Sequence, residues 1–198
     1  FLFAGVSYYK AGAPPVVDLG GTVLRPGDRE LLRGFYVDGL GEFAYRNGLD
    51  LTGIELVGGT EDATPVPTRL GEGRPLVPFG GGIDSLVTVD TVTRTYDDVA
   101  LFVVNRKGDR FAAIERAAEA TGLPVVRVER EVDPQILRPA DPGRFLNGHV
   151  PITGILSAVA VVAAVRHGRD LVVMSNEWSA SKGNLEHEGR LVNHQHSK

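Results

Sequence analysis

The sequence predicts an α/β protein in which a parallel sheet has helices on both faces and a small α+β region precedes it. Three observations support this prediction. From residue 75 onward, short apolar runs that suit buried strands alternate with segments of helical periodicity. These runs are almost continuously apolar, which is typical of parallel strands covered on both faces. Residues 1–70, by contrast, hold only two strand-like runs around a segment rich in glycine and aromatic residues.

The N-terminal region, residues 1–70, gives few signals. Strand-like runs lie at Pro15–Asp18 and Leu51–Leu56, and the segment Phe35–Tyr45 suits a helix. The stretch that follows, TEDATPVPTRLGEGRP, is rich in Pro, Gly and Thr and therefore predicts a linker. We expect a second domain over residues 75–198.

The second domain is predicted to contain four strands and three helices. Gly122 and Gly168 each follow a helical segment and predict its end, and Asp109 suits the N-cap of the middle helix. The last helix is apolar nearly all round, which predicts that it is buried. In chain order we expect strand 75–79, helix 84–95, strand 99–104, a helix ending at Gly122, strand 124–129, helix 153–166 and strand 170–174.

Composition excludes several classes of function. The chain has 198 residues, of which 42% are hydrophobic, so it is long enough to bury a sizeable core. Its net charge of -4 gives no electrostatic reason to expect nucleic acid as a partner. Because there is no cysteine, disulfides and cysteine-ligated zinc sites are excluded within this chain. The sequence leaves the oligomeric state open.

The ends of the chain and its longest apolar run bear on localisation. The first residues have neither a basic region nor an apolar run long enough for a signal peptide. The run Ile155–Val165 is too short to span a bilayer, so we expect a cytoplasmic protein without membrane insertion. Because the chain starts at Phe1 and stops after His-Ser-Lys, we expect a piece of a longer protein, truncated at the C-terminus.

Residues Arg74–Ser85, RPLVPFGGGIDS, predict a phosphate-binding loop. An apolar strand runs into three glycines, which let the backbone approach a ligand with no Cβ in the way. The helix that follows points free N–H groups and its positive dipole end at the same place. A Walker loop and a dinucleotide fingerprint both need other spacings. A simple glycine turn between a strand and a helix is the alternative interpretation.

Polar clusters follow three of the predicted strands. They are Gly80–Ser85, Asn105-Arg106-Lys107 and Ser175-Asn176-Glu177. Parallel sheets bind ligands beyond the carboxyl ends of their strands, and these clusters fall at that edge. Their convergence favours a nucleotide site over a plain glycine turn.

Three glycines followed by Asp84 and Ser85 resemble the loop of the PP-loop ATP pyrophosphatases, usually Ser-Gly-Gly-x-Asp-Ser; Gly80 replaces the Ser. The blocks FLFAGVSYYKAGAPP, SNEWSASKGN and VNHQHSK are similar to the ATP-dependent UDP-N-acetylmuramoyl-L-alanyl-L-glutamate epimerases, a family of bacterial peptidoglycan-precursor enzymes. The resemblance implies a domain like the adenine nucleotide alpha hydrolases. It also implies inversion of the terminal L-glutamate to D-glutamate through an acyl-adenylate. ATP would be converted to AMP and pyrophosphate in the presence of Mg²⁺.

The resemblance also implies roles for residues of the loop. Gly80, Gly81 and Gly82 would cradle the phosphates of ATP through backbone N–H groups, and Ser85 would add a hydroxyl. Asp84 would either assist Mg²⁺ or cap the helix, and the sequence leaves both roles open.

Further contacts are expected outside the loop. Asn105 and Arg106 would contact adenosine or phosphate, with a plain loop role equally open. Lys182 is a candidate partner for an anionic group of ATP or of the UDP-sugar-peptide substrate.

Four side chains are candidates for proton transfer at the glutamate Cα. His149, His194 and His196 titrate near neutral pH, and Glu177 is the fourth candidate. The sequence leaves open which is the acid and which the base. His187 lies in an acidic run and is interpreted as simply exposed.

Two other functions stay open at this point. The chain could be another PP-loop enzyme, a ligase or amidotransferase that forms an amide through the same acyl-adenylate. It could also be a non-catalytic adenine-nucleotide-binding protein, which would not need the dense polar residues at 175–198.

Overall fold

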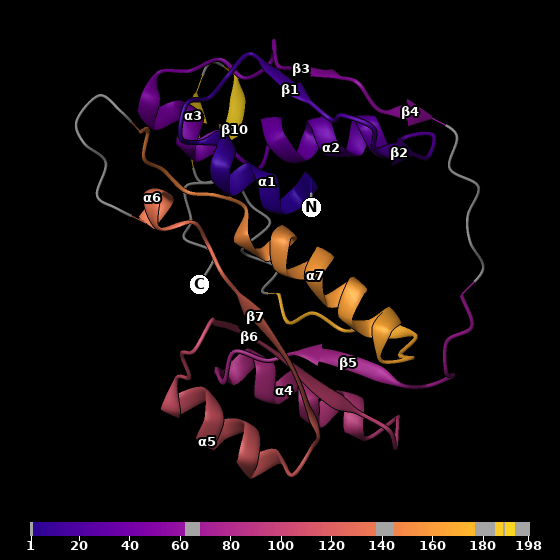
Figure 1. Ribbon diagram of the computed structural model, residues 1–198. Coiled ribbons are helices and arrows are strands. Elements are labelled where there is room, and N and C mark those ends of the chain that lie inside the picture. The colour runs from indigo at the N-terminus through magenta and orange to yellow at the C-terminus, as the bar shows by residue number, and fades with distance from the viewer. Residues whose placement is uncertain (1, 62–67, 138–144, 177–184, 188, 193–198) are drawn as a thin grey trace. The chain divides into compact units, whose positions relative to one another are not determined.

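The computed structural model describes residues 2–61, 68–137, 145–176, 185–187 and 189–192, and the chain divides into two compact units (Figure 1). Unit 1 comprises Phe1–Val66, Asp133–Ile155 and Ser179–Lys198, and unit 2 comprises Pro67–Val132 and Leu156–Trp178. The sequence predicted a single boundary between residues 70 and 75. In the structure the chain returns twice to unit 1 after leaving it.

Unit 2 is built on a four-stranded parallel sheet with the strand order β7–β6–β5–β8. In the register, Leu76 of β5 lies opposite Ala100 of β6 on one side and Val172 of β8 on the other. The parallel sheet predicted from the apolar runs is confirmed. Its strands are β5 (Pro75–Pro78), β6 (Ala100–Arg106), β7 (Val125–Arg130) and β8 (Leu171–Val172).

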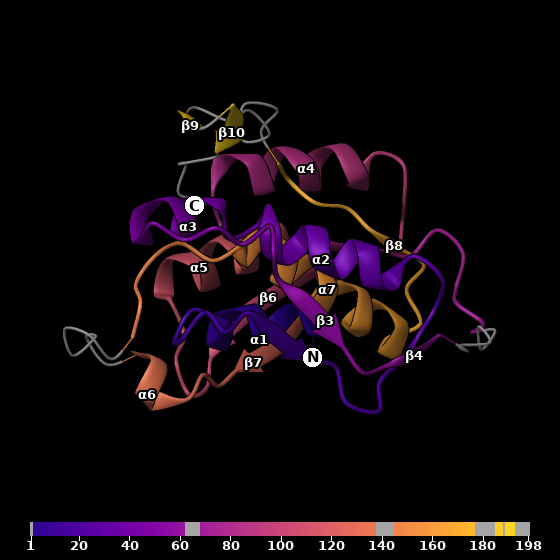
Figure 2. The same cartoon turned by 90° about the horizontal axis from the view of Figure 1, so that it is seen from above.

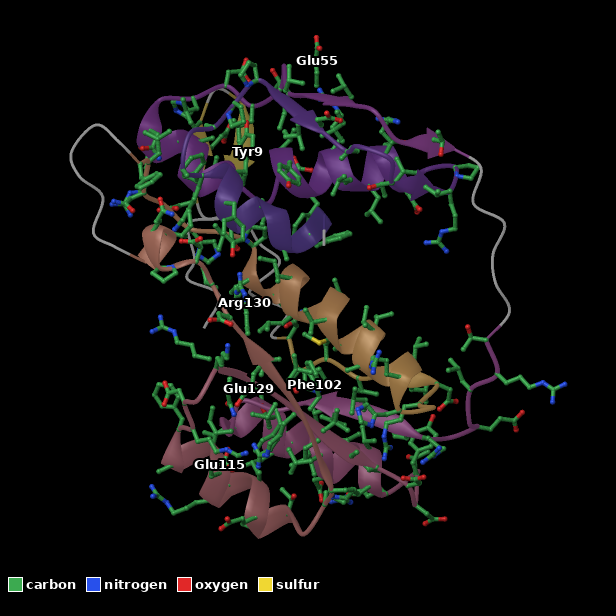
Figure 3. The ribbon with its side chains drawn as sticks, viewed as in Figure 1. Tyr9, Glu55, Phe102, Glu115, Glu129 and Arg130 are labelled. Carbon is green, nitrogen blue, oxygen red and sulfur yellow. The ribbon has the colours of Figure 1, made fainter. Side chains whose placement is uncertain are left out.

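Helices cover both faces of this sheet, as predicted (Figure 1). They are α4 (Ile83–Thr93), α5 (Ala112–Thr121) and α7 (Ile152–Arg166). Alternate strand residues point to opposite faces. Val77 and Leu101 pack with α4 and α5, whereas Leu76 and Phe102 (labelled in Figure 3) pack with α7. Helix α5 is also tied to β7, because Arg127 donates two hydrogen bonds of 2.7 and 2.8 Å to the Glu115 carboxylate.

Helix α7 is buried on one face only. Its small side chains Ala160, Ala163 and Ala164 lie against the sheet, but Val161 and Val165 are exposed. The prediction that this helix is buried all round is therefore wrong for its outer face. No helix within the described residues is long and apolar enough to cross a membrane.

The helix ends in unit 2 confirm two predictions and correct a third. Gly122 and Gly168 adopt φ values of 69° and 63° just after α5 and α7, as helix-ending glycines do. The predicted capping role of Asp109 is wrong, because α5 begins at Ala112 with Phe111 at its N-cap. Asp109 instead lies in the preceding turn, where its N–H donates to the Arg106 carbonyl at 3.0 Å.

Charged side chains join the strands at the amino edge of the sheet. The buried Arg169 guanidinium donates to the carbonyls of Pro75 (3.1 Å) and Asp98 (2.9 Å) and to the Asp98 carboxylate (3.2 Å). Arg74 Nε donates to the same carboxylate at 2.6 Å. Asp170 accepts the backbone N–H groups of Gly73 (3.0 Å) and Arg74 (2.7 Å). The starts of β5, β6 and β8 are thereby held together.

We expect acid to weaken these contacts. The Arg74 side chain lowers the pKa of Asp98, and the Arg74 backbone N–H lowers the pKa of Asp170. A carboxyl whose pKa is lower in the folded than in the unfolded protein stabilises the fold at pH values above its unfolded pKa of about 3.9. This stabilisation is lost as the pH falls through the pKa of the folded state. Thermal unfolding should therefore show a melting temperature that falls below about pH 4. The variants Asp98→Asn and Asp170→Asn should show a shallower fall, and slopes equal to that of the parent would contradict this assignment.

Unit 1 packs short strands on helices. Two parallel pairs, β1 with β3 and β2 with β4, lie beside the helices α1 and α2 (Figure 1 and Figure 2), and β9 and β10 form an antiparallel hairpin. Tyr9 and Tyr36 meet edge to face in the core, with ring centroids 5.3 Å apart. The elements are α1 (Leu2–Tyr9), β1 (Val16–Asp18), β2 (Val23–Leu24), α2 (Asp28–Val37), α3 (Gly41–Asn47), β3 (Glu55–Val57), β4 (Thr60–Glu61), α6 (Pro134–Leu137), β9 (Leu185–His187) and β10 (Arg190–Val192).

The helix predicted over Phe35–Tyr45 is two helices, α2 and α3, with a break between them. Gly39 lies in the break, where a Cβ would clash with the Phe35 carbonyl oxygen and stand 2.8 Å from Pro151 Cγ. The sharp turn thus depends on a residue without a side chain. The strand predicted at Leu51–Leu56 forms only from Glu55.

Candidate functional site

The glycine loop continues directly from β5 at the carboxyl edge of the sheet. Phe79 donates its N–H to the Phe102 carbonyl at 2.8 Å, so the chain stays beside β6 as it enters the loop. Gly81 has a φ of 74°, in the left-handed region, and a Cβ there would stand 3.3 Å from Ile114 Cα on α5. The fold itself therefore requires glycine at position 81.

Gly80 and Gly82 are under no such constraint. Neither has a positive φ. A Cβ at Gly80 would lie 4.0 Å from Ser85 Oγ, and one at Gly82 would meet no atom of the described residues within 4 Å. Open backbone at these two positions is what close approach of a ligand needs.

The N-terminus of α4 faces this open backbone. Gly82 is the N-cap, with φ -82° and ψ 172°, and no described side chain caps the helix. The first-turn N–H groups therefore lack intrahelical acceptors and carry the positive end of the helix dipole. Asp84 lies inside the first turn, so its suggested role as the helix cap is wrong. Its carboxylate is exposed, which leaves the metal role as a proposal.

Ser85 holds the loop in shape. Its side chain is buried, and its Oγ accepts the Gly80 N–H at 3.2 Å. The hydroxyl hydrogen can still donate, because a hydroxyl both accepts and donates. Within the described part of the chain, no three carboxylate or imidazole side chains come close enough to hold a metal ion on their own.

The strand order places this loop at a topological switch point. β5 lies between β6 and β8. The chain passes from β5 through α4 to β6 on one side, whereas it reaches β8 on the other side through α7, which covers the opposite face. In open α/β sheets the crevice at such a point, beyond the carboxyl ends of the strands, is where ligands bind. Ser175 follows β8 at this edge, and its Oγ is buried without a hydrogen-bond partner among the described residues.

Asn105 and Arg106 lie at the same edge but one strand further on. They form the last two residues of β6, opposite Glu129 and Arg130 of β7, so the strand extends two residues beyond its predicted end. Asn105 is buried and Arg106 is exposed. The structure therefore brings these two residues to the edge that carries the glycine loop.

One of the four proton-transfer candidates, His149, lies among the described residues. His149 belongs to unit 1, where its N–H donates to Glu42 Oε2 at 2.6 Å. The buried Glu42 carboxylate also accepts from Arg46 at 3.2 Å. The other three, Glu177, His194 and His196, lie outside the described residues, as does Lys182, the candidate partner for an anionic group.

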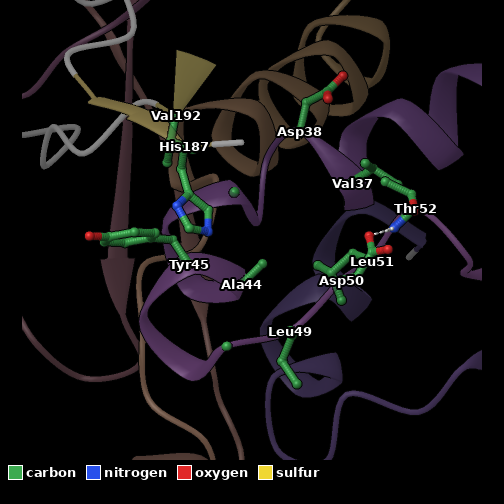
Figure 4. A pocket seen from close by; sticks show the side chains of 12 residues that line it. Val37, Asp38, Ala44, Tyr45, Leu49, Asp50, Leu51, Thr52, His187 and Val192 are labelled. Carbon is green, nitrogen blue, oxygen red and sulfur yellow. Dashed lines mark hydrogen bonds between the residues drawn. The ribbon is translucent and has the colours of Figure 1, made fainter. Parts of the chain in front are cut away.

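Unit 1 contains a pocket of about 800 Å³ that sequence reasoning missed (Figure 4). Its walls come from the end of α2, from α3 and residues 48–52, and from the β9–β10 hairpin. His187 is exposed, as interpreted above, but it also lines this pocket and meets the Tyr45 ring edge to face, with centroids 4.9 Å apart. The one signal that pointed here was the dense polar composition of residues 175–198.

Comparison with known proteins adds a family and relatives. The whole chain, residues 1–198, matches the family model described as MurL N-terminal domain. Proteins named UDP-N-acetyl-alpha-D-muramoyl-L-alanyl-L-glutamate epimerase are similar to it in three bacteria. That of Xanthomonas oryzae pv. oryzae is 39% identical over 198 residues (100% of this chain, 43% of the relative), and that of Salinispora tropica is 40% identical over 199 residues (100% and 42%). That of a Micromonospora species is 39% identical over 198 residues (98% and 43%), so the chain spans less than half of each relative.

Proposed function

This chain belongs to the family of MurL N-terminal domains, and we propose from that premise that it forms the nucleotide-binding part of an ATP-dependent epimerase. The shared name of its relatives supports the substrate, UDP-N-acetylmuramoyl-L-alanyl-L-glutamate, and a role in peptidoglycan precursor synthesis. The observation that carries the nucleotide part is the open glycine loop before α4, at the switch point of the sheet. The activity itself is proposed for the whole protein, because this chain spans less than half of the relatives.

The loop suits the phosphates of ATP. The uncapped first turn of α4 offers N–H donors and the positive end of a dipole, and the glycines on either side of Gly81 leave room for phosphate oxygens. Ser85 Oγ, which accepts the Gly80 N–H, keeps its hydroxyl hydrogen for a phosphate oxygen. A PP-loop binds the phosphates of ATP with donors of this kind. We propose Asn105, Arg106 and Lys182 as further contacts to the nucleotide.

Asp84 suits Mg²⁺ in this arrangement. Mg²⁺ is commonly bound through one or two carboxylates together with phosphate oxygens, so a single protein carboxylate beside the phosphates is sufficient. When bound, Mg²⁺ would neutralise charge on the phosphates. Without a cation between them, the Asp84 carboxylate would repel the phosphates instead.

Adenylation explains why ATP is needed for an epimerisation. A free carboxylate makes the neighbouring Cα–H very hard to remove, because a carbanion would form beside an anion. Attack of the glutamate α-carboxylate oxygen on the α-phosphorus of ATP breaks the bond to the β-phosphate and releases pyrophosphate. A base can then take the Cα proton from the resulting acyl-adenylate, and an acid returns a proton to the opposite face. Hydrolysis of the acyl-adenylate releases AMP and the D-glutamate product.

The side chains that move this proton are proposed from the sequence alone. His149, His194, His196 and Glu177 remain the candidates for the acid and the base. Only His149 lies in the described part of the chain, where the Glu42 carboxylate fixes its backbone.

The variant Asp84→Asn tests the metal role. The ATP affinity of the chain is measured by calorimetry with and without Mg²⁺. In the parent, Mg²⁺ should strengthen ATP binding roughly tenfold, about 1.4 kcal/mol, and in Asp84→Asn this gain should vanish. Stronger Mg²⁺-ATP binding by the variant would contradict the role, because it would show that the carboxylate only repels phosphate.

A further inference from the structure

The pocket of unit 1 is lined by elements that contact one another. Its volume of about 800 Å³ lies within the range of small-molecule sites. The hairpin wall is held on α3 by the Tyr45–His187 ring contact and by Val192, which is buried. A Cβ at Gly41 would lie only 3.7 Å from Val192 Cγ1, so hairpin and helix are in direct contact. Segments about 140 residues apart in the sequence thus build one cavity.

The charges in this pocket have a single sign. Asp38 and Asp50 line it, across from the Tyr45–His187 pair in Figure 4, and neither Lys nor Arg is among the described lining residues. Carboxylates in a cavity repel phosphate and carboxylate groups. They accept hydrogen bonds from hydroxyl and amide N–H groups, and such bonds are stronger than those between neutral groups. The pocket therefore suits an uncharged ligand rich in these donors.

The Asp38 carboxylate has no described partner in the fold. Asp38 follows the last residue of α2, at the negative end of the helix dipole, where a carboxylate is unfavourable. Its carboxylate makes no hydrogen bond or ion pair with a described residue, although it lines the pocket. Asp50, by contrast, accepts the Thr52 N–H at 2.8 Å. Binding of a ligand to this carboxylate would explain why it stands beside the cavity at a position that is unfavourable for the helix.

We propose that this pocket binds the N-acetylmuramoyl sugar of the substrate. The inference rests on the proposed function, because it takes the ligand from that substrate. The diphosphate at one end and the glutamate at the other are anionic, and the sugar and alanyl amide between them are the uncharged part. Hydroxyl and amide N–H groups of the sugar would donate to Asp38 and Asp50, and Tyr45 would contact its C–H face.

The test uses N-acetylmuramoyl-L-alaninamide, a neutral probe without diphosphate or glutamate, titrated into the protein without ATP. Binding should shift the NMR signals of Tyr45 and His187. Asp38→Ala should weaken probe binding about tenfold, the effect of losing one charge-assisted hydrogen bond. Glu30→Ala removes another exposed carboxylate, in the first turn of α2 and outside the pocket, and it should bind like the parent.

The outcomes separate this inference from the proposed function. No binding of the probe by the parent protein, or equal binding by Asp38→Ala, would overturn the inference. Stronger binding of UDP than of the probe at Tyr45 and His187 would overturn it too, because it would show that the pocket takes anions. Turnover of the complete substrate is measured separately: turnover without probe binding removes this inference alone, whereas probe binding without turnover removes the epimerase and leaves a sugar site.

Discussion

Replacement of Gly82 by valine should weaken ATP binding at least a hundredfold, about 2.8 kcal/mol, without unfolding the protein. The backbone at Gly82 is extended, which any residue can adopt, and no described atom lies within 4 Å of the Cβ position. A valine therefore fits the fold. Its side chain would occupy the open space before the first turn of α4, where the phosphates are proposed to bind. Calorimetry measures the affinity, and thermal unfolding reports on the fold.

Gly81→Ala is the matched control for this variant. Gly81 has a φ of 74° and lies against Ile114, so an alanine there should lower the stability of unit 2 by about 1–2 kcal/mol. We therefore expect Gly82→Val to lose ATP affinity and Gly81→Ala to lose stability. Unchanged ATP affinity in Gly82→Val would show that the loop is only a turn.

Arg169→Ala should destabilise the protein by about 2–3 kcal/mol, because a buried guanidinium with several partners is lost. The variant leaves the carbonyls of Pro75 and Asp98 without their donor at the amino edge of the sheet. Urea unfolding measures the change. Because the glycine loop lies at the opposite edge, the folded variant should bind ATP with unchanged affinity.

Arg94→Ala provides the comparison for Arg169. Arg94, the residue that follows α4, pairs at 2.7 Å with the exposed Asp90 of that helix, four residues earlier. Exposed pairs of this kind contribute about 0.3–0.5 kcal/mol, so this variant should barely change the unfolding midpoint. Equal losses in the two variants would show that the Arg169 contacts contribute no more than a surface ion pair.

The local features of unit 2 could be predicted from the sequence. The strands are near-continuous apolar runs, and Gly122 marks a helix end that the left-handed backbone then adopts. The glycine loop was likewise visible, because three glycines between a strand and a helix have few structural explanations. The switch point was not visible, because it depends on the strand order and not on any segment by itself.

What the sequence did not reveal depends on contacts between distant segments. The return of residues 133–155 to unit 1 rests on pairs such as His149 with Glu42 and Asn147 with Asn47. The break between α2 and α3 depends on Gly39 packing against Pro151, more than one hundred residues away. The ring contact between His187 and Tyr45 could not be predicted either, because only the folded hairpin brings the two residues together. Local periodicity carries no information on such pairs.

Adenylation of the substrate glutamate is tested most directly by analysis of the nucleotide products. The full-length protein is incubated with ATP, Mg²⁺ and UDP-N-acetylmuramoyl-L-alanyl-L-glutamate, and AMP, ADP and pyrophosphate are followed by chromatography. We expect AMP and pyrophosphate only when the substrate is present, together with D-glutamate in the product on chiral analysis. ADP and phosphate, or no turnover despite bound ATP, would contradict adenylation.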